Sequence, residues 1–307
     1  MSALYNDPSW PRASRWLAGD HLPHPIGRIA VIGAPVRLGS ITPGRCDLAP
    51  QAIRSALDRF STYDVEFGRE LSEVAAQDFG NVDSLAGFTV EQSFAPVREA
   101  LAAALHNADA AILLGGDNSI TRPGCHALGP VNKCGLLTLD AHFDLRDLDQ
   151  GLTNGNPVRA LLADGLPGSQ IVQIGIQSFA NSKAYDAVSR EAGITVVTAE
   201  QVIAQGIDAA VSRALERLAG TADSIYVDLD LDVLDRAFSP ATPGSRPGGL
   251  APWQIRRAAR LCGLHPKVRA MDLVEIDPEK DIADTTCLAA AACLLSFVSG
   301  LHERLKR

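Results

Sequence analysis

Three potential metal ligands stand at alternate positions directly after an apolar, strand-like run. Asp140, His142 and Asp144 follow the segment Leu136–Leu139. Side chains two residues apart on an extended segment point the same way, so this spacing aims two carboxylates and one imidazole at one spot. That donor set suits Mn²⁺, and Zn²⁺, Ni²⁺ or Co²⁺ would be tolerated. Short motifs also arise by chance, and a solvated loop after a strand is the alternative interpretation.

A second strand-like segment, 224–235, places acidic residues at every second position. The aspartates of one face are Asp228, Asp230 and Asp232, while the other face is apolar. Like charges on one face repel and are costly to bury unpaired, so a positive group should lie there. We expect Asp230 and Asp232 to meet the first three ligands at a shared pair of metal ions, as in two-metal hydrolases. The alternative is an exposed acidic edge strand.

Length and composition indicate one α/β domain. The chain has 307 residues, of which 46% are apolar, so it can bury a large core. We expect a single domain over 1–307, with an irregular N-terminal arm over 1–27. The formal charge of −8 provides no basic face for nucleic acid. The six cysteines lack the paired spacing of a zinc site, which favours reduced core thiols.

Neither end of the chain indicates a membrane protein. The N-terminus lacks the basic start and apolar segment of a secretory signal. The longest apolar stretch, Cys287–Leu295 with Phe297 and Val298 beyond it, is shorter than the roughly 20 residues that span a bilayer. We therefore expect a cytoplasmic protein with a buried helix near its C-terminus.

The elements that must position the ligands follow a repeating pattern. From Ile29 onward, apolar strand-like segments alternate with amphipathic helices, which is typical of parallel βαβ units. The eight expected parallel strands cover 29–34, 74–77, 110–114, 135–139, 171–176, 194–197, 225–230 and 268–273. The expected helices include 49–60, 90–107, 184–192, 207–219, 253–264 and 285–305. Ligands of such a sheet bind at the carboxyl ends of its strands, where the acidic residues lie.

Two further motifs fall at the same predicted edge. Gly115 and Gly116 permit a tight turn, which would place Asn118 or Ser119 at a helix start beside the pocket. Glu275 follows the last predicted strand. An ion pair at the strand end is the alternative interpretation of Glu275.

Together these motifs carry a resemblance to a known family. They are Gly115-Gly116-Asp117-Asn118-Ser119, Asp140-Ala141-His142-Phe143-Asp144, Asp230-Leu231-Asp232 and Val274-Glu275-Ile276-Asp277-Pro278. In order and spacing they resemble the ureohydrolase family of arginase, agmatinase and formimidoylglutamase. The resemblance implies a three-layer α/β/α fold of the arginase type with an eight-stranded parallel sheet. It also implies two Mn²⁺ per subunit, hydrolysis of a C–N bond in a small guanidine or amidine, and a homo-oligomer, either a trimer or a hexamer.

The resemblance assigns a metal role to each of five residues. It implies that Asp140 and Asp230 bridge the two ions. Asp144 would hold the first ion, and His142 and Asp232 would hold the second.

One position departs from the family pattern. Most members have a histidine in the Gly-Gly-Asp-His-Ser motif as another ligand of the first ion, whereas this sequence has Asn118. An amide oxygen binds a divalent ion more weakly than an imidazole does. We expect the first site to be labile, to prefer a harder ion, or to be empty in the isolated protein.

The implied mechanism uses a metal-bridging water that is ionised near neutral pH because two cations stabilise hydroxide. The hydroxide attacks the planar amidine carbon. We expect Glu275 to pair with the cationic amidinium and to orient that carbon. Asp144 would carry the proton to the departing amine.

The loops after the histidine motif resemble formimidoylglutamase more closely than arginase or agmatinase. The latter two typically carry a histidine where Asn154 stands and lack the arginine at position 146. The guanidinium of Arg146 can hold a substrate carboxylate by paired hydrogen bonds, and N-formimidoyl-L-glutamate has two carboxylates. The candidate substrate-binding residues are Arg146, Asn154, Asn156 and Glu275.

The predicted reaction is therefore N-formimidoyl-L-glutamate plus water to L-glutamate and formamide, a step of histidine breakdown. Arg159 and Arg246 would assist, although a surface role suits each of them. For Arg146 the alternative is an ion pair with Asp147 or Asp149 on a solvated loop. The rival functions are a guanidino-acid or agmatine hydrolase that releases urea, and a non-catalytic relative whose Asn118 signals lost activity.

Overall fold

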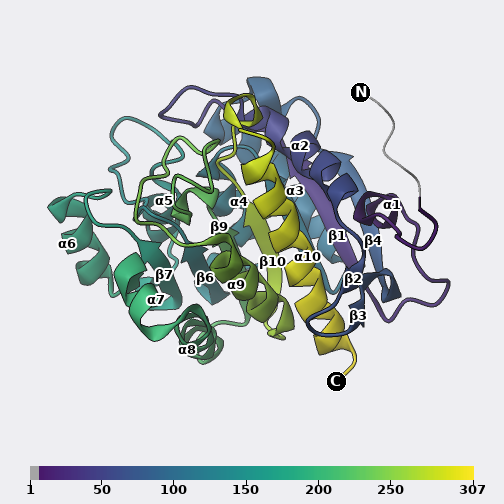
Figure 1. Ribbon diagram of the computed structural model, residues 1–307. Helices are drawn as coiled ribbons and strands as arrows, with labels where there is room; N and C mark the ends of the chain where they lie inside the picture. The colour runs from purple at the N-terminus through teal and green to yellow at the C-terminus, as the bar shows by residue number, and fades with distance from the viewer. Residues whose placement is uncertain (1–6) are drawn as a thin grey trace.

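The computed structural model describes residues 7–307. The strands of its main sheet are β1 (Gly27–Ala34), β4 (Val74–Asn81), β5 (Ala110–Gly115), β6 (Cys134–Leu139), β7 (Ile171–Ile176), β8 (Thr195–Thr198), β9 (Ser224–Leu229) and β10 (Val268–Leu273). They form one parallel sheet in the order β4-β1-β5-β10-β9-β6-β7-β8, between two layers of helices (Figure 1). Each strand lies on a predicted segment, so the expected three-layer architecture is confirmed.

Alternate strand residues pack into two cores, one on each face of the sheet. In β1, Ile29 and Val31 belong to the first core, and Ala30 and Ile32 belong to the second. Successive side chains of a strand point to opposite faces, so a sheet covered on both faces needs such an unbroken apolar run. The first core is covered by α2 (Ala49–Ala56), α7 (Ala199–Gln205), α8 (Ile207–Ala219), α9 (Pro252–Leu264) and α10 (Thr285–Leu305). The second is covered by α3 (Val90–Leu105), α4 (Thr121–Ala127), α5 (Pro157–Ala163) and α6 (Lys183–Ala192).

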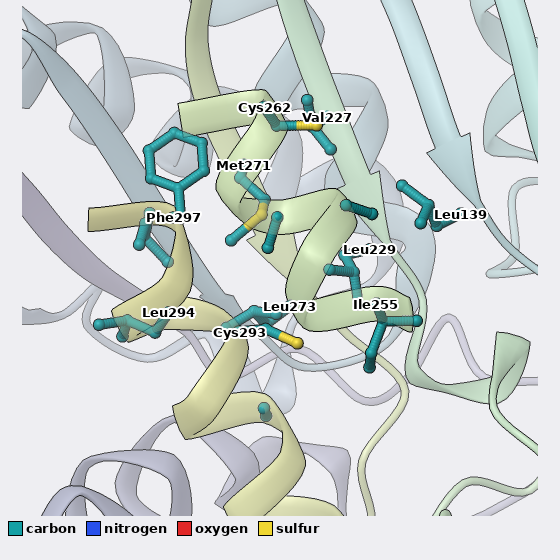
Figure 2. Packing of buried hydrophobic residues seen from close by; sticks show 14 of the residues in the cluster. Leu139, Val227, Leu229, Ile255, Cys262, Met271, Leu273, Cys293, Leu294 and Phe297 are labelled. Atoms are coloured by element: carbon teal, nitrogen blue, oxygen red, sulfur yellow. The ribbon is translucent and has the colours of Figure 1, made fainter. Parts of the chain in front are cut away.

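The C-terminal helix α10 is a core element. Figure 2 shows Cys293, Leu294 and Phe297 of this helix packed with Ile255 and Cys262 of α9 over the central strands. The helix extends beyond the apolar stretch to 21 residues, and by length and composition it is the one described helix able to cross a bilayer. However, 72% of its most apolar window is buried inside the protein, which confirms a buried helix. All six cysteines are buried and free, as expected for core thiols.

The N-terminal arm is more ordered than its sequence indicates. Residues 1–6 of the predicted arm lie outside the described part of the chain. The remainder contains the short helix α1 (Ala13–Leu17), whose buried Trp16 donates from Nε1 to the carbonyl oxygen of Val74 over 2.8 Å. A short antiparallel hairpin, β2 (Tyr63–Asp64) with β3 (Arg69–Glu70), was also not predicted. Both elements lie away from the ends of the central strands (Figure 1).

Four neighbouring strands at the centre of the sheet, β5, β10, β9 and β6, carry the motifs that the sequence singles out. Each motif begins where its strand ends. The carboxyl ends of parallel strands share one edge of the sheet, so polar side chains from segments far apart in the chain meet there.

Candidate metal and substrate site

The pairing of β6 with β9 brings the two acidic segments together. Leu139 pairs with Leu229 at the ends of these strands, and the next residues in the two segments are Asp140 and Asp230. The backbone N–H of Asp230 donates to the carbonyl oxygen of Leu139 over 3.0 Å, which continues the pairing past the strand end. The two carboxylates expected to bridge the metals therefore leave adjacent strands at the same level.

His142, Asp140 and Asp232 form the tightest group of potential ligands. His142 Nδ1 lies 2.9 Å from Asp232 Oδ2 and 3.5 Å from Asp140 Oδ1. One ligand atom from each of the three residues lies within 4.8 Å of the others. The other oxygen of Asp232, Oδ1, accepts the backbone N–H of Ala141 over 3.2 Å, which fixes the carboxylate. These three residues could hold one metal ion.

Asn118 and Asp144 form a second pair beside this group. Asn118 begins the 3₁₀ turn Asn118–Ile120 after β5, and its side-chain Nδ2 lies 2.5 Å from Asp144 Oδ2. Asp144 has a φ of 53°, a left-handed backbone conformation that is uncommon for a residue with a side chain. Such a conformation persists only where the surroundings impose it, and it often marks a functional position. Both residues are buried.

The carboxylates lack the positive charge that their burial demands. Burial, followed by the charge of Asp232, raises the pKa of Asp140 to about 7 and raises the pKa of Asp230 well above its usual range. Burial, followed by the charge of Asp140, does the same to the pKa of Asp144. Oδ2 of Asp140 is buried and accepts no hydrogen bond from any described residue. A pair of divalent cations would supply the missing partners, so the donor set fits two metal ions.

His142 has carboxylates on one side and an arginine on the other. The charge of Asp232 raises the pKa of His142 to about 11, and its hydrogen bonds to the neighbouring carboxylates act in the same direction. Burial opposes ionisation of Asp232, but the charge and hydrogen bond of His142 lower its pKa. On the solvent side, Arg246 Nη1 lies 2.8 Å from His142 Nε2. Nε2 can accept from Arg246 only when it carries no proton, so the arginine and a proton compete for this nitrogen.

Glu275 is fixed from three directions at the end of β10. Its backbone N–H donates to the carbonyl oxygen of Gly116 over 3.0 Å, and its φ is 67°. Its Oε1 accepts the backbone N–H of Asn118 over 2.7 Å and Nδ2 of Asn154 over 2.9 Å. Burial, followed by the charge of Asp117, raises the pKa of Glu275 to about 8. The carboxyl group is therefore held in one orientation without a basic partner.

Gly116 makes this arrangement possible. A Cβ at this position would lie 2.2 Å from the carbonyl oxygen of Val36, a distance that no side chain can occupy. The glycine lets two backbone segments approach closely beneath Glu275. The two-glycine turn expected from the sequence thus has a packing role.

These groups open into a cavity of about 150 Å³. From the clusters above, Asp144, Asp230, Asp232, His142 and Glu275 line it. Other lining residues include Arg146, Asn154, Asn181, Tyr185, Gly244 and Arg246. Predicted site residues from three of the four motifs therefore border one space, whereas Asn118 and Asp140 are not among its lining residues.

The substrate-binding predictions have different outcomes. Arg146 is exposed at the cavity and forms no ion pair with any described residue, so the alternative of a pair with Asp147 or Asp149 is not seen. Asn154 lines the cavity and orients Glu275. Asn156 does not line it.

The placement of Asn156 corrects its assignment as a substrate ligand. Its Oδ1 accepts the backbone N–H of Thr153 over 2.8 Å, and its Nδ2 donates to the carbonyl oxygens of Asp147 and Gly151. Because both ends of the amide bind backbone groups, Asn156 closes the loop instead of facing a ligand. Arg159 is also outside the cavity lining, whereas Arg246 borders it.

Two residues of the site were not predicted. Asn181 accepts the N–H of Phe143 over 2.9 Å and donates to the carbonyl oxygen of Ala141 over 2.9 Å, so it holds the backbone on both sides of His142. A Cβ at Gly244 would lie 2.0 Å from Asp232 Oδ2. Neither residue belongs to a motif with metal-ligand spacing, and only the folded chain brings them to His142 and Asp232.

A parallel sheet with carboxylates, an imidazole and a fixed glutamate at the ends of its central strands defines an α/β/α hydrolase class. The chain matches the Arginase family over residues 27–299. It belongs to the arginase family.

Similar proteins support this assignment. The formimidoylglutamase of Halalkalibacterium halodurans is 36% identical over 280 residues, covering 90% of this chain and 88% of that protein. The crystal structure of formimidoylglutamase from Bacillus subtilis superimposes with a TM-score of 0.87 at 29% identity, covering 98% of this chain and 95% of that one. The fold also matches a Trypanosoma cruzi formiminoglutamase structure with Mn²⁺, with a TM-score of 0.86 at 22% identity and coverage of 96% and 99%.

Proposed function

We propose that the protein is a formimidoylglutamase, which hydrolyses N-formimidoyl-L-glutamate to L-glutamate and formamide. The observation that carries this proposal is the shared cavity in which the fixed Glu275 and Arg146, which forms no ion pair with any described residue, border the carboxylate cluster. A ligand there would meet a guanidinium suited to a carboxylate and a carboxylate suited to an amidinium. The 36% identity to a formimidoylglutamase supports the same assignment.

The proposed metal ligands are Asn118, Asp140, His142, Asp144, Asp230 and Asp232. The carboxylate-rich donor set, and the Mn²⁺ named for the Trypanosoma cruzi structure, support manganese as the metal. A pair of such ions supplies hydroxide near neutral pH and Lewis acidity when it is bound.

Glu275 would bind the amidinium end of the substrate. Its Oε1 is already occupied by the N–H of Asn118 and by Asn154, which leaves Oε2 to pair with a substrate N–H. This pairing would orient the planar amidine carbon towards the carboxylate cluster and would favour the cationic form of the substrate.

Asp144 would carry a proton to the departing amine. It lines the cavity and is buried, and burial followed by the charge of Asp140 raises its pKa, which favours proton uptake. Its left-handed backbone fixes the carboxyl group beside Asn118. A buried carboxyl group that takes up a proton and borders the cavity suits general acid catalysis.

Arg146 would hold a carboxylate of the glutamate part. Arg246 would hold the second carboxylate, because it borders the same cavity on the side of His142. Two arginines for two carboxylates distinguish this substrate from agmatine, which has none.

The test is a product assay on the Mn²⁺-reconstituted protein with formimidoylglutamate, guanidinobutyrate, agmatine and arginine, in which formamide is measured separately from urea. Formamide from formimidoylglutamate as the main product is the expected result. Urea from guanidinobutyrate without formamide would instead identify a guanidino-acid hydrolase, which needs only one of the two arginines.

A non-catalytic relative would behave differently. It would turn over none of the four compounds when loaded with metal, and Asn118→His would not restore activity. The intact set of five other ligands argues against this alternative, since uncompensated buried carboxylates are costly to retain.

We also propose that the chain is one domain over 1–307 that assembles as a cytoplasmic homo-oligomer, as the family resemblance implies. The one eight-stranded sheet, to which segments from most of the described chain contribute, supports the first part. Light scattering of the purified protein measures the oligomeric state.

A further inference from the structure

A buried polar chain runs beneath Asn118, away from the cavity. Thr121 Oγ1 lies 2.8 Å from Asn118 Oδ1 and 2.9 Å from Asp272 Oδ2. All three side chains are buried, and they come from the start of α4 and its preceding turn and from β10. Of these three hydrogen-bonded residues, only Asn118 is a proposed metal ligand. This series of hydrogen bonds therefore connects the core of the sheet to Asn118, the one unusual ligand.

Asp272 is an acceptor in this chain. The hydroxyl of Tyr226 lies 2.9 Å from Asp272 Oδ2, and the backbone N–H of Leu229 donates to Oδ1 over 3.1 Å. The place of the tyrosine hydroxyl depends on Gly124 of α4, where a Cβ would lie 2.2 Å from that oxygen. The Tyr226 hydroxyl and the Leu229 N–H therefore both donate to Asp272.

Thr121 has one hydroxyl proton and two acceptor atoms within reach. If the proton points to Asp272, Thr121 can only accept from Asn118, and the group that Asn118 turns towards it must be the amide nitrogen. The carbonyl oxygen of Asn118 then occupies the position 2.5 Å from Asp144 Oδ2. Two oxygens at that separation repel each other unless a cation lies against both.

We propose that Thr121 and Asp272 are positioning residues that make Asn118 a metal ligand. Through them, the carbonyl oxygen of the Asn118 amide turns towards the first cation, while the amide nitrogen donates to Thr121. Without a cation, the reverse orientation is favoured, in which Nδ2 donates to Asp144. This inference rests on the proposed two-metal site, and it explains how Asn118 can act at the position where the family pattern has a histidine.

The test measures Mn²⁺ binding and not turnover. Binding stoichiometry and affinity are measured by calorimetry and by electron paramagnetic resonance for the wild type, Thr121→Val and Asp272→Asn. Thr121→Val removes the hydroxyl and keeps the shape. Asp272→Asn introduces a donor that can turn the Thr121 proton back to Asn118. Both variants should weaken the binding of the first cation by about 10–100-fold, as loss of a ligand's supporting partner does. The affinity for the second cation should be unchanged.

Two further variants give the comparison. Thr62→Val makes the same change at another buried threonine whose hydroxyl has no partner among the described residues, and it should bind both cations normally. Thr121→Ser keeps the hydroxyl and should restore binding. If Thr121→Val does not fold, as judged by its circular dichroism, Asp272→Asn decides.

The outcomes separate this inference from the proposed function. If the wild type binds no Mn²⁺, the metal site itself is wrong. If the wild type binds two ions and Thr121→Val and Asp272→Asn bind both with unchanged affinity, the role of Thr121 and Asp272 is overturned and the two-metal site stands.

Discussion

Asn154 Nδ2 lies 2.9 Å from Glu275 Oε1, and this hydrogen bond joins the loop after β6 to the end of β10. The same oxygen accepts the N–H of Asn118, so one atom ties together three loops of the site. A glutamate held in this way can present only its other oxygen to a substrate. Its direction is therefore set before a ligand arrives.

Replacing Glu275 by glutamine should remove the charge and keep the size. We expect kcat/KM for formimidoylglutamate to fall by about 10²–10³-fold, the usual effect of removing one group that stabilises the reacting centre. Mn²⁺ binding should be unchanged, because Glu275 is not a proposed ligand. Steady-state kinetics and calorimetry measure both quantities, with Glu99→Gln on the exposed face of α3 as the control. Activity near the wild-type level would contradict the proposed role.

Replacing Arg146 by methionine should weaken substrate binding. Loss of a charged hydrogen-bonding partner costs about 1.5–3 kcal/mol, so KM should rise roughly 10–150-fold with a smaller change in kcat. Arg190→Met is a matched control, because Arg190 is an exposed arginine on α6 outside the cavity. An equal effect of both substitutions, or none at Arg146, would show that this arginine does not contact the substrate.

Metal-free protein should lose stability as the pH rises through the neutral range. The pKa of Asp140 is raised from 3.8 to about 7 and that of Glu275 from 4.5 to about 8, mainly by burial. A carboxyl group with a raised folded-state pKa holds a proton that the unfolded chain releases. Its contribution is complete below the unfolded pKa and is lost as the pH passes the folded pKa. Thermal melts between about pH 4.5 and pH 8 should show a falling Tm.

Added Mn²⁺ should oppose this loss. A cation at one hundred times its Kd stabilises the fold by about 2.7 kcal/mol. Its effect should increase with pH, because it replaces protons on the carboxylates. The same melts with Mn²⁺ and with a chelator measure this difference. A metal-free Tm that rises over this range would contradict the raised pKa values.

Gly244→Ala should damage the second metal site. The new Cβ would lie 2.0 Å from Asp232 Oδ2 and 2.9 Å from His142 Cε1, so these side chains must move. We expect at least about tenfold weaker binding of the second cation, comparable with loss of a supporting partner. Gly87→Ala is the control, because a Cβ there meets nothing within 4 Å. Unchanged Mn²⁺ affinity in Gly244→Ala would show that binding of the second cation does not depend on the observed position of Asp232.

Much of this arrangement could be predicted because it depends on local patterns. The ligands at Asp140, His142 and Asp144, and again at Asp230 and Asp232, follow directly on two apolar runs, which marks where two strands end. The strand alternation itself does not continue through them, because Asp144 has a φ of 53° and Asp232 lies in the 3₁₀ turn Leu231–Val233. The βαβ order then puts both strand ends at one edge of the sheet. The eight strands were predictable for the same reason, since a doubly covered sheet needs continuous apolar runs.

Residues whose role depends on distant loops could not be predicted. Asn181 meets the backbone around His142 only after β7 is placed beside β6. Asn156 has the polarity of a ligand, yet its amide is used within its own loop. The β2–β3 hairpin contains only two paired residues on each side, which is too short for a periodic signal.

The loop that contains Arg146 and Asn154 closes on itself, through the N–H of Arg146 to the carbonyl oxygen of Gly155 and through Asn156. Beyond Asp144 it supplies no proposed metal ligand. On the proposed function, Arg146 and the proposed metal ligands would therefore belong to different segments of the chain, which the hydrogen bond of Asn154 to Glu275 connects. Residues 145–156 should therefore be exchangeable. Grafting the equivalent loop of a relative with another substrate preference should redirect the hydrolysis to a new compound, while the sheet that carries the proposed metal ligands is preserved.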